Sequence, residues 1–158
     1  EVPDLDVLLV PLGGGGLLSG CAVATRHLRA ATAVFGVEPA AGDDWARSWQ
    51  AGEAQRIDPP DTIADGLRVT EPGLLTWPVV REFASGVLTV SDDQIRAAMR
   101  MLVERLKLVV EPSGAVGLAA ALSGLLPKKA RRVGIVLSGG NIEIPRLNRL
   151  LSDELHVP

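Results

Sequence analysis

Four consecutive glycines, Gly13–Gly16, follow an apolar run and precede a stretch with helical spacing. Glycine loses more conformational freedom on folding than any other residue, so four in a row are costly unless the backbone must approach something closely. Backbone N–H groups at the start of a helix, uncovered by side chains, form a site for an anion. The stretch therefore predicts a bound phosphate, and the alternative is a tight turn that binds no ligand.

Two kinds of nucleotide site use a loop of this type. A loop for nucleoside triphosphates needs Lys followed by Ser or Thr, and residues 17–19 are Leu-Leu-Ser, which excludes it. A dinucleotide site stays open, because residues 14–19 are close to the Gly-x-Gly-x-x-Gly fingerprint and Glu38 lies where a ribose-binding acid is expected. However, the third glycine of the fingerprint is absent.

The elements that must position this loop alternate between strands and helices. Residues 6–11 form a continuous apolar run typical of a strand buried on both faces, 17–31 has helical spacing, and 33–39 is a second strand. The patterns further predict a helix over 42–53, a loop over 55–69, a helix over 71–86 with a break or fresh start near Trp77, a strand over 87–90, and helices over 91–107 and 111–126. Residues 131–141 are expected to form a last strand that runs into a glycine turn. Residues Ser91 and Gln94 predict a capping box. We therefore expect an α/β fold with an open, mostly parallel sheet and helices on both faces.

Bulk composition limits the possible partners. The chain has 158 residues and a net charge of −3, and its only tight basic cluster lies at 128–132, so we expect no nucleic acid partner. The one cysteine, Cys21, excludes an internal disulfide and suits a reducing compartment. No apolar stretch approaches the length of a membrane span. These features predict a cytoplasmic protein with no membrane partner.

Four stretches taken together carry a family resemblance. They are PLGGGGLLSG at 11–20, TIADGL at 62–67, EPSGAVGLAA at 111–120 and LSGGN at 137–141. In this order and spacing they resemble the C-terminal half of a pyridoxal-phosphate (PLP) enzyme of fold type II, with serine racemases and serine/threonine dehydratases the most similar members. The resemblance implies a tryptophan-synthase-β-like fold, in which residues 1–158 would be one piece, the C-terminal part of the large PLP-binding domain.

The resemblance also implies roles for individual residues. The N–H groups of Gly13, Gly14, Gly15 and Gly16 would hold the cofactor phosphate, with Leu17 beside them. Ser138, followed by Gly139, would bond the pyridine nitrogen through its hydroxyl. A serine cannot supply the charge of a carboxylate, so the ring nitrogen would stay largely unprotonated, which moderates the electron sink and suits elimination chemistry.

Two further residues are implied on the cofactor side. Gly66 would place a backbone carbonyl near the face or ring oxygen of the cofactor, and Glu111 would point toward the cofactor. The alternatives are ordinary structural roles. Residues 137–141 could form a plain turn from strand to helix, and Glu111 could cap the helix that follows it.

The stretch VEPAAGDDW at 37–45 resembles a cation-binding stretch of metal-dependent racemases. By this resemblance Glu38 and Asp44 would provide carboxylate oxygens and Gly42 a backbone carbonyl, with water completing the shell. Hard oxygen ligands suit Mg²⁺, Ca²⁺ or Mn²⁺. The alternative is that Asp43 and Asp44 only cap the next helix.

The lysines of the chain bear on nucleotide binding and on catalysis. Metal-dependent racemases bind ATP at positions that match Lys107 and Asn141, which makes ATP a further candidate ligand, although Lys107 also fits an ordinary helix end. A PLP enzyme needs a lysine for the Schiff base, and none of Lys107, Lys128 and Lys129 lies in the Ser-x-Lys setting of the family. We therefore expect the Schiff-base lysine to come from an N-terminal half that these residues lack.

The function implied for the complete enzyme is elimination of water from L-serine or L-threonine, giving a 2-oxo acid and ammonia, or racemisation of serine. Both reactions stay open. Its expected partners are the N-terminal half, a small amino acid and a second copy in a homodimer. The alternative is a non-catalytic module that binds a cofactor or nucleotide. Trp45, Trp49 and Trp77 are expected to serve packing or an interface, and His27 and His156 to lie on the surface.

Overall fold

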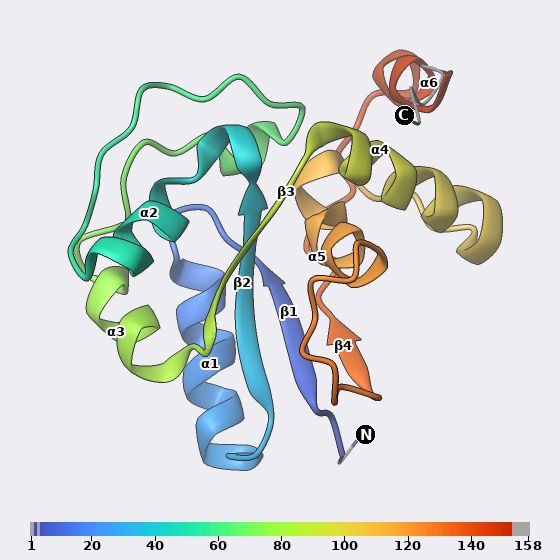
Figure 1. Cartoon of the computed structure of the whole chain (residues 1–158). Coiled ribbons are helices and arrows are strands. Elements are labelled where there is room, and N and C mark those ends of the chain that lie inside the picture. The colour runs from blue at the N-terminus through green and yellow to red at the C-terminus, as the bar shows by residue number, and fades with distance from the viewer. Residues whose placement is uncertain (1, 3, 153–158) are drawn as a thin grey trace.

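The strands of the described structure lie parallel in one sheet (Figure 1). The computed structural model describes residues 2 and 4–152, so His156 lies outside it. Its strands are β1 (Val7–Pro11), β2 (Ala33–Pro39), β3 (Gly86–Val90) and β4 (Val133–Ile135). They lie in the order β3-β2-β1-β4. The predicted α/β class with a parallel sheet is confirmed.

Helices cover both faces of this sheet, as expected (Figure 1). One face carries α1 (Gly16–Leu28), α2 (Asp44–Ala51) and α3 (Thr76–Phe83). The other carries α5 (Pro112–Leu122), with α4 (Asp92–Met101) packed on α5 and α6 (Ile144–Ser152) packed on α4. None of the helices in the described part of the chain is long and apolar enough to span a bilayer.

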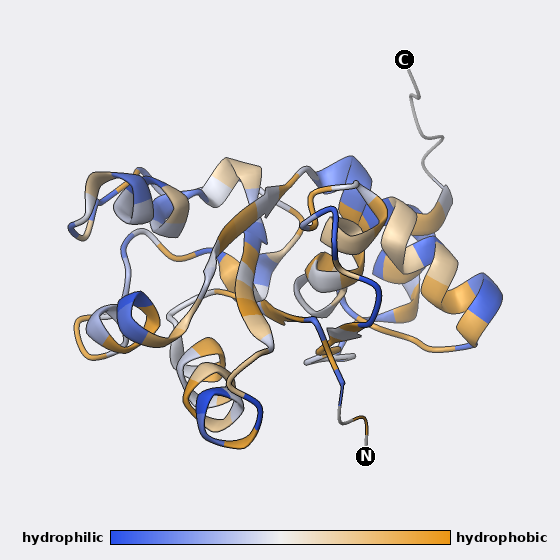
Figure 2. Ribbon diagram, turned by 60° about the horizontal axis from the view of Figure 1, so that its bottom comes forward, coloured by the Kyte–Doolittle hydropathy of each residue, from blue (hydrophilic) through white to orange (hydrophobic). Residues whose placement is uncertain are grey.

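Alternation along the strands produces two apolar layers. Leu9 and Val37 pack in the cluster under α4, α5 and α6, whereas Val10 and Val34 pack in the cluster under α1, α2 and α3. Successive side chains of a strand point to opposite faces, so one continuous apolar run fills both layers. Figure 2 shows largely hydrophobic strands in the centre and hydrophilic residues gathered on the outer helices and loops.

The predicted helix over 71–86 is wrong at both ends. α3 begins only at Thr76, because the amides of Thr76 and Trp77 first form a turn by donating to the carbonyl oxygen of Gly73. Gly86 opens β3 instead of ending a helix. The fresh start expected near Trp77 is confirmed.

The predicted helix over 91–107 begins as expected and ends differently. The Ser91 hydroxyl accepts the amide of Gln94, and the Gln94 side chain accepts the amide of Ser91, which confirms the capping box. Beyond α4 the helix continues as a π-helical turn over Leu102–Leu106. Such turns occur mostly as local widenings of an α-helix.

The end of the chain departs most from the prediction. The strand expected at the start of 131–141 is limited to β4, and beyond Val136 the chain leaves the sheet, as the expected glycine turn implies, with the Gly139 carbonyl accepting the amide of Glu111. α6 is not among the predicted elements. Its signal is a buried pair at helical spacing, Leu147 and Leu150, within a short segment that follows a glycine turn.

The carboxyl ends of the four strands lie at one edge of the sheet, because the strands are parallel. The glycine loop follows β1, residues 40–43 follow β2, and residues 136–141 follow β4. In open α/β sheets, ligands bind in the crevice beyond the carboxyl ends of the strands. The fold thus gathers motifs that are far apart in the sequence at the edge where a ligand is expected.

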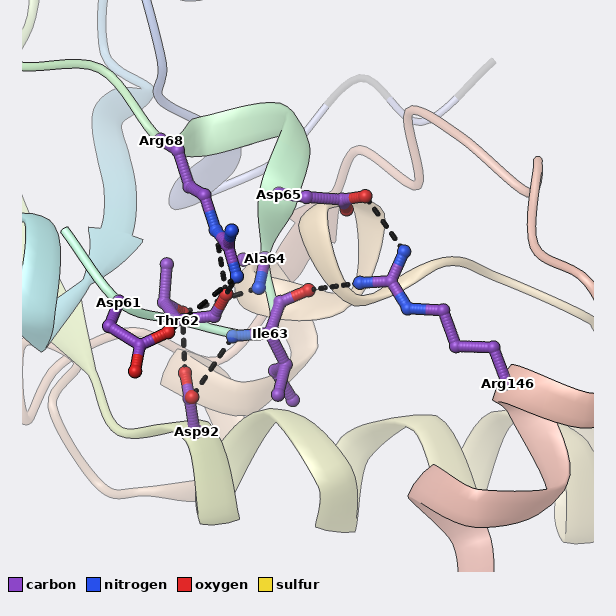
Figure 3. A network of polar contacts seen from close by, with 8 residues as sticks. All are labelled: Asp61, Thr62, Ile63, Ala64, Asp65, Arg68, Asp92 and Arg146. Carbon is purple, nitrogen blue, oxygen red and sulfur yellow. Dashed lines mark hydrogen bonds and ion pairs between the residues drawn. The ribbon is translucent and has the colours of Figure 1, made fainter. Parts of the chain in front are cut away.

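Polar contacts with α4 hold the loop over 61–68, which carries the TIADGL motif (Figure 3). Asp92, at the start of α4, accepts the hydroxyl of Thr62 at 2.5 Å and the amide of Ile63 at 3.0 Å. Thr62 is buried, so its O–H group depends on the carboxylate as its acceptor, while its oxygen accepts the amide of Ala64 at 3.2 Å. The contacts therefore fix the loop to the helix layer.

Two arginines complete this network (Figure 3). Arg68 donates from Nε to the carbonyl oxygen of Thr62 at 2.9 Å and closes the loop on itself. Arg146 reaches from α6 to the carbonyl oxygen of Ile63 at 2.9 Å and to the carboxylate of Asp65 at 2.7 Å. The hydrogen bond from Arg146 lowers the pKa of Asp65. The last helix of the chain is thereby tied to the segment that precedes Gly66.

Replacing Asp92 by alanine should lower the free energy of unfolding by about 1–3 kcal/mol, because a buried hydroxyl and an amide lose their acceptor. Asp93→Ala is the matched control. Asp93 lies in the same helical turn, but its bond of 2.7 Å goes to Arg96. The control should change stability by less than about 0.5 kcal/mol in urea unfolding. Equal losses in both variants would attribute the effect to the helix terminus rather than to the contacts with Thr62 and Ile63.

Candidate cofactor site

The glycine loop is packed on one side and open on the other. A Cβ added at Gly15, where φ is +88°, would lie 2.6 Å from both Thr76 Oγ1 and Trp45 Cζ2, so only glycine fits there. At Gly14 and Gly16 an added Cβ would meet no atom within 4 Å. The open side of the loop therefore faces free space at the edge of the sheet.

Two hydrogen bonds turn the carbonyl groups of this loop toward the protein. The indole Nε1–H of Trp45 donates to the carbonyl oxygen of Gly13 at 2.6 Å, and Thr76 Oγ1 donates to that of Gly14 at 2.6 Å. In a planar trans peptide the N–H points opposite to the C=O, so the amides of Gly14 and Gly15 point away from these two donors. α1 starts directly after the loop, and its first amides have no acceptor within the helix. This arrangement suits a phosphate.

The other predicted motifs are joined to the loop in a chain of contacts that starts at Gly66. The carbonyl oxygen of Gly66 would be 3.3 Å from a Cβ on Gly13, and the amide of Gly66 donates to Ser113 Oγ at 2.9 Å. A Cβ on Gly139 would be 2.5 Å from a carboxylate oxygen of Glu111, so the Glu111 side chain lies directly on the LSGGN turn. The amide of Glu111 also donates to the Gly139 carbonyl at 3.1 Å. The three motifs therefore form one continuous wall.

Ser138 lies at the same edge because of the register of β4. Ile135 pairs with Leu9, and the amide of Val136 donates to the carbonyl oxygen of Leu9 at 2.9 Å. Ser138 follows two residues later, beyond the carboxyl end of β4. It is exposed, as are Gly14, Gly16, Leu17 and Gly66. The described residues thus line the site from one side, with the serine hydroxyl accessible to a ligand.

Glu111 does not cap α5 with its side chain. It occupies the N-cap position, yet its carboxylate makes no capping hydrogen bond and lies instead on Gly139. The capping alternative for Glu111 is therefore wrong, and its carboxylate is directed to the wall of the site.

Glu38 takes the capping role that the sequence suggests for Asp43 and Asp44. Its carboxylate accepts the amides of Trp45 at 3.3 Å and Ala46 at 2.8 Å, in the first turn of α2. Asp43 makes no capping hydrogen bond and pairs instead with Arg47 at 2.7 Å. Since Glu38 is only 1% exposed, it is not available to a ribose. This burial argues against the dinucleotide alternative.

Asp44 is a buried carboxylate without a donor. It is 0% exposed, and neither of its side-chain oxygens has a hydrogen-bond partner. Burial raises the pKa of Asp44 to about 7 and that of Glu38 to about 9, and the nearby negative charges add to both shifts. A divalent cation would supply the missing partner for Asp44, with Gly42 in the turn directly before α2. Among residues 2 and 4–152 no three acidic, histidine or cysteine side chains converge, so such a site would rest on two carboxylates and a carbonyl.

The segments that carry the predicted nucleotide residues approach each other, since a Cβ on Gly140 would lie 2.8 Å from the carbonyl oxygen of Val109. Lys107, at φ 59°, donates from Nζ to the carbonyl oxygen of Glu104 at 2.6 Å. Asn141 is exposed and lies directly after the LSGGN glycines. ATP binding at these two residues stays a prediction.

Three residues of the site are not among those that the sequence predicts. Trp45 and Thr76 set the direction of the glycine loop, and Ser113 holds Gly66. Trp45 is fully buried, which agrees with the expected packing role. Its indole also donates a hydrogen bond to Gly13, a role that the sequence did not predict. His27 is exposed, as expected.

Known proteins match this chain over nearly its whole length. A family model for pyridoxal-phosphate dependent enzymes matches residues 1–139. L-threo-3-hydroxyaspartate ammonia-lyase of Saccharomyces cerevisiae is 46% identical over 152 residues, which cover 96% of this chain and 47% of that relative. Serine racemase of Schizosaccharomyces pombe is 44% identical, again over 96% of this chain and 47% of the relative. The chain therefore spans about half the length of the curated relatives it matches.

Solved structures share the fold. A threonine deaminase from T.th. superposes with a TM-score of 0.84 at 45% identity, over 89% of this chain and 50% of that one. Maize serine racemase superposes with a TM-score of 0.87 at 43% identity, over 94% of this chain and 46% of that one. The family model covers residues 1–139, which is most of the chain, so this chain belongs to the family of pyridoxal-phosphate dependent enzymes.

Proposed function

We propose that this chain forms the cofactor-binding part of a PLP-dependent ammonia-lyase or racemase that acts on a small hydroxy amino acid. The observation that carries the proposal is the meeting of the glycine loop, Gly66, Glu111 and the turn at 138–139 on one edge of the sheet. The names of the relatives, ammonia-lyase, threonine deaminase and serine racemase, support this substrate class.

The residues of the wall would divide the work of holding the cofactor. The amides of Gly14 and Gly15, with the first turn of α1, would bind the phosphate, and Ser138 would donate to or accept from the ring nitrogen. PLP, when bound, supplies an electron sink that makes the α-proton of an amino acid acidic. A neutral serine at the ring nitrogen tempers that sink, which suits loss of a β-hydroxyl. Glu111 would keep the Ser138–Gly139 turn in place through its contact with Gly139.

The outcome depends on residues that hold or move the α-proton. Departure of the β-hydroxyl leads to a 2-oxo acid and ammonia, and return of the proton from the opposite face leads to the enantiomer. We propose that the groups selecting between these outcomes lie outside the described residues, and that the substrate carboxylate is also bound there.

The Schiff-base lysine is proposed to come from elsewhere in the complete protein. Lys107 is engaged with the Glu104 carbonyl. Lys129 lines a hollow with Asp6 and Val7, at the start of β1 and thus at the end of the sheet opposite the glycine loop. An N-terminal half that carries the lysine, in a homodimer, would complete the enzyme.

Gly14→Asp should abolish PLP retention without unfolding the protein. A Cβ at this position would meet no protein atom within 4 Å, and the aspartate would add a carboxylate at the proposed phosphate site. At about 4 Å two unit charges repel by on the order of 4 kcal/mol near a protein surface, so the Kd for PLP should rise by about a hundredfold or more. Absorbance titration of the complete protein measures this.

Gly20→Asp is the matched control, because Gly20 is exposed in α1 and equally free of neighbours within 4 Å. It should bind PLP like the parent. Unchanged PLP affinity in the Gly14 variant would exclude the glycine loop as the phosphate site.

Ser138→Ala should lower turnover more than stability. The serine is exposed, so its removal should change the free energy of unfolding by less than about 0.5 kcal/mol. Loss of the bond to the ring nitrogen should reduce kcat and shift the absorbance of the bound cofactor. Ser138→Thr, which keeps the hydroxyl, should restore part of both. A stability loss that matches the activity loss would indicate a purely structural turn.

We also propose that Glu38, Gly42 and Asp44 bind a divalent cation of the Mg²⁺, Ca²⁺ or Mn²⁺ type. The support is the pair of buried Asp44 oxygens without donors, next to a buried Glu38 that still has free lone pairs. Leaving a buried carboxylate unpaired is costly, and a cation would offset that cost. The cation would thus act on the stability of the first turn of α2 rather than on the chemistry.

Adding Mg²⁺ or Ca²⁺ to chelator-treated protein should raise Tm by about 5–10 °C at a hundred times the Kd, since binding then contributes about 2.7 kcal/mol. Asp44→Asn should remove this increment, because a neutral amide replaces the carboxylate. Asp43→Asn, whose parent side chain faces Arg47, should keep it. A parent protein whose Tm ignores both cations would rule the site out.

A further inference from the structure

Trp45 makes hydrogen bonds to both Glu38 and the glycine loop. Its backbone amide donates to Glu38 Oε2 at 3.3 Å, and its indole Nε1–H donates to the carbonyl oxygen of Gly13 at 2.6 Å. It directly follows Asp44, and its side chain is 0% exposed. The indole therefore has no route to solvent for its N–H, which must keep the Gly13 carbonyl as its acceptor.

We propose that Trp45 is a positioning residue that couples a divalent cation at Glu38 and Asp44 to the binding of the PLP phosphate at the glycine loop. This inference rests on the proposed function for both ligands. It adds an energetic coupling between the proposed cation site and the proposed phosphate site. The coupling is assigned to the hydrogen bond from the Trp45 indole to the Gly13 carbonyl oxygen.

At the glycine loop, the Trp45 indole fixes the orientation of one peptide group. The bond to the Gly13 carbonyl fixes the plane between Gly13 and Gly14, and the amide of Gly14 then points into the open side of the loop. The ring also lies against Gly15, where an added Cβ would be 2.6 Å from Trp45 Cζ2. A displacement of the indole therefore has to move the loop with it.

On the side of the acids, Trp45 lies in the turn that a cation would fix. Glu38 already holds the amides of Trp45 and Ala46. Asp44 has two buried side-chain oxygens without hydrogen-bond partners. A cation held by the carboxylates of Asp44 and Glu38 would fix the first turn of α2, and with it the start of the Trp45 side chain.

Two neighbours provide the matched controls. Thr76 fixes the next peptide of the loop through the Gly14 carbonyl at 2.6 Å, and it lies in α3 rather than in the turn that Glu38 caps. Trp49 lies in α2 beside Trp45, and its ring is covered by the Arg81 guanidinium at 4.8 Å. Thr76 thus reports on the loop alone, and Trp49 reports on the helix alone.

The experiment measures the Kd for PLP by absorbance titration of the complete protein that contains these residues, with chelator and with saturating Mg²⁺. In the parent, Mg²⁺ should lower this Kd by about threefold to tenfold, the worth of one neutral hydrogen bond. By linkage, PLP should lower the Kd for Mg²⁺ by the same factor. Trp45→Phe should raise the Kd for PLP. In this variant the ratio of the Kd measured with chelator to the Kd measured with Mg²⁺ (the Mg²⁺ ratio) should be below about twofold.

A second variant removes only the hydrogen-bond donor. Incorporating 3-benzothienylalanine at position 45 replaces the indole N–H by sulfur and keeps the ring volume, so it decides the question if Trp45→Phe does not fold. It should also lose the Mg²⁺ ratio. In both variants the rise of Tm with Mg²⁺ should remain, since the carboxylates are intact.

The controls separate coupling from general damage. Thr76→Val should raise the Kd for PLP in both conditions and keep the Mg²⁺ ratio, and Trp49→Phe should change neither value. A Mg²⁺ ratio that persists in both Trp45 variants would overturn the inference in favour of direct attraction between the two charges. A parent that binds PLP with Mg²⁺-independent affinity would also overturn it and leave the proposed function intact, whereas a parent that binds no PLP would refute both.

Discussion

The proposed phosphate site depends on the direction of two neighbouring peptide planes. Trp45 and Thr76 hold the carbonyl oxygens of Gly13 and Gly14, so the amides that follow point outward. The donors come from α2 and α3, which pack with α1 on one face of the sheet. The arrangement of that layer is therefore what turns a flexible run of glycines into a binding surface.

The opposite layer secures the remaining wall of the site. The loop that carries Gly66 is tied to α4 by Asp92 and to α6 by Arg146 (Figure 3). Gly66 itself is held by Ser113 at the start of α5. Both layers of helices thus converge on the carboxyl edge of the sheet, which explains why motifs spread over most of the chain form one surface.

Two buried acidic side chains near the start of α2 differ in their hydrogen-bond partners. Glu38 is stabilised by two backbone amides of α2, whereas Asp44 has no donor at all within the described structure. An uncompensated buried carboxylate lowers stability, and the proposed cation would compensate it at Asp44. The same turn carries Trp45, which places this cost next to the residue that orients the glycine loop.

Local sequence patterns predicted much of this structure. The features that they did not predict depend on contacts between residues far apart in the sequence. The strands, the glycine loop and the Ser91 capping box follow from neighbours in the sequence. The hydrogen bond between Trp45 and Gly13 joins residues 32 apart, and that between Thr76 and Gly14 joins residues 62 apart, which no local pattern reveals. The capping of α2 by Glu38 likewise needs the turn at residues 40–42 to bring the carboxylate back to the helix.

The most direct test of the phosphate site is the amide spectrum of the complete protein labelled with ¹⁵N-glycine, recorded before and after addition of PLP. Hydrogen bonds to a phosphate should shift the amide protons of Gly14, Gly15 and Gly16 strongly downfield. The resonances of Gly52 and Gly124, which lie in helix-ending turns away from the strand ends, should stay in place. PLP binding that leaves the loop glycines unshifted would contradict this account.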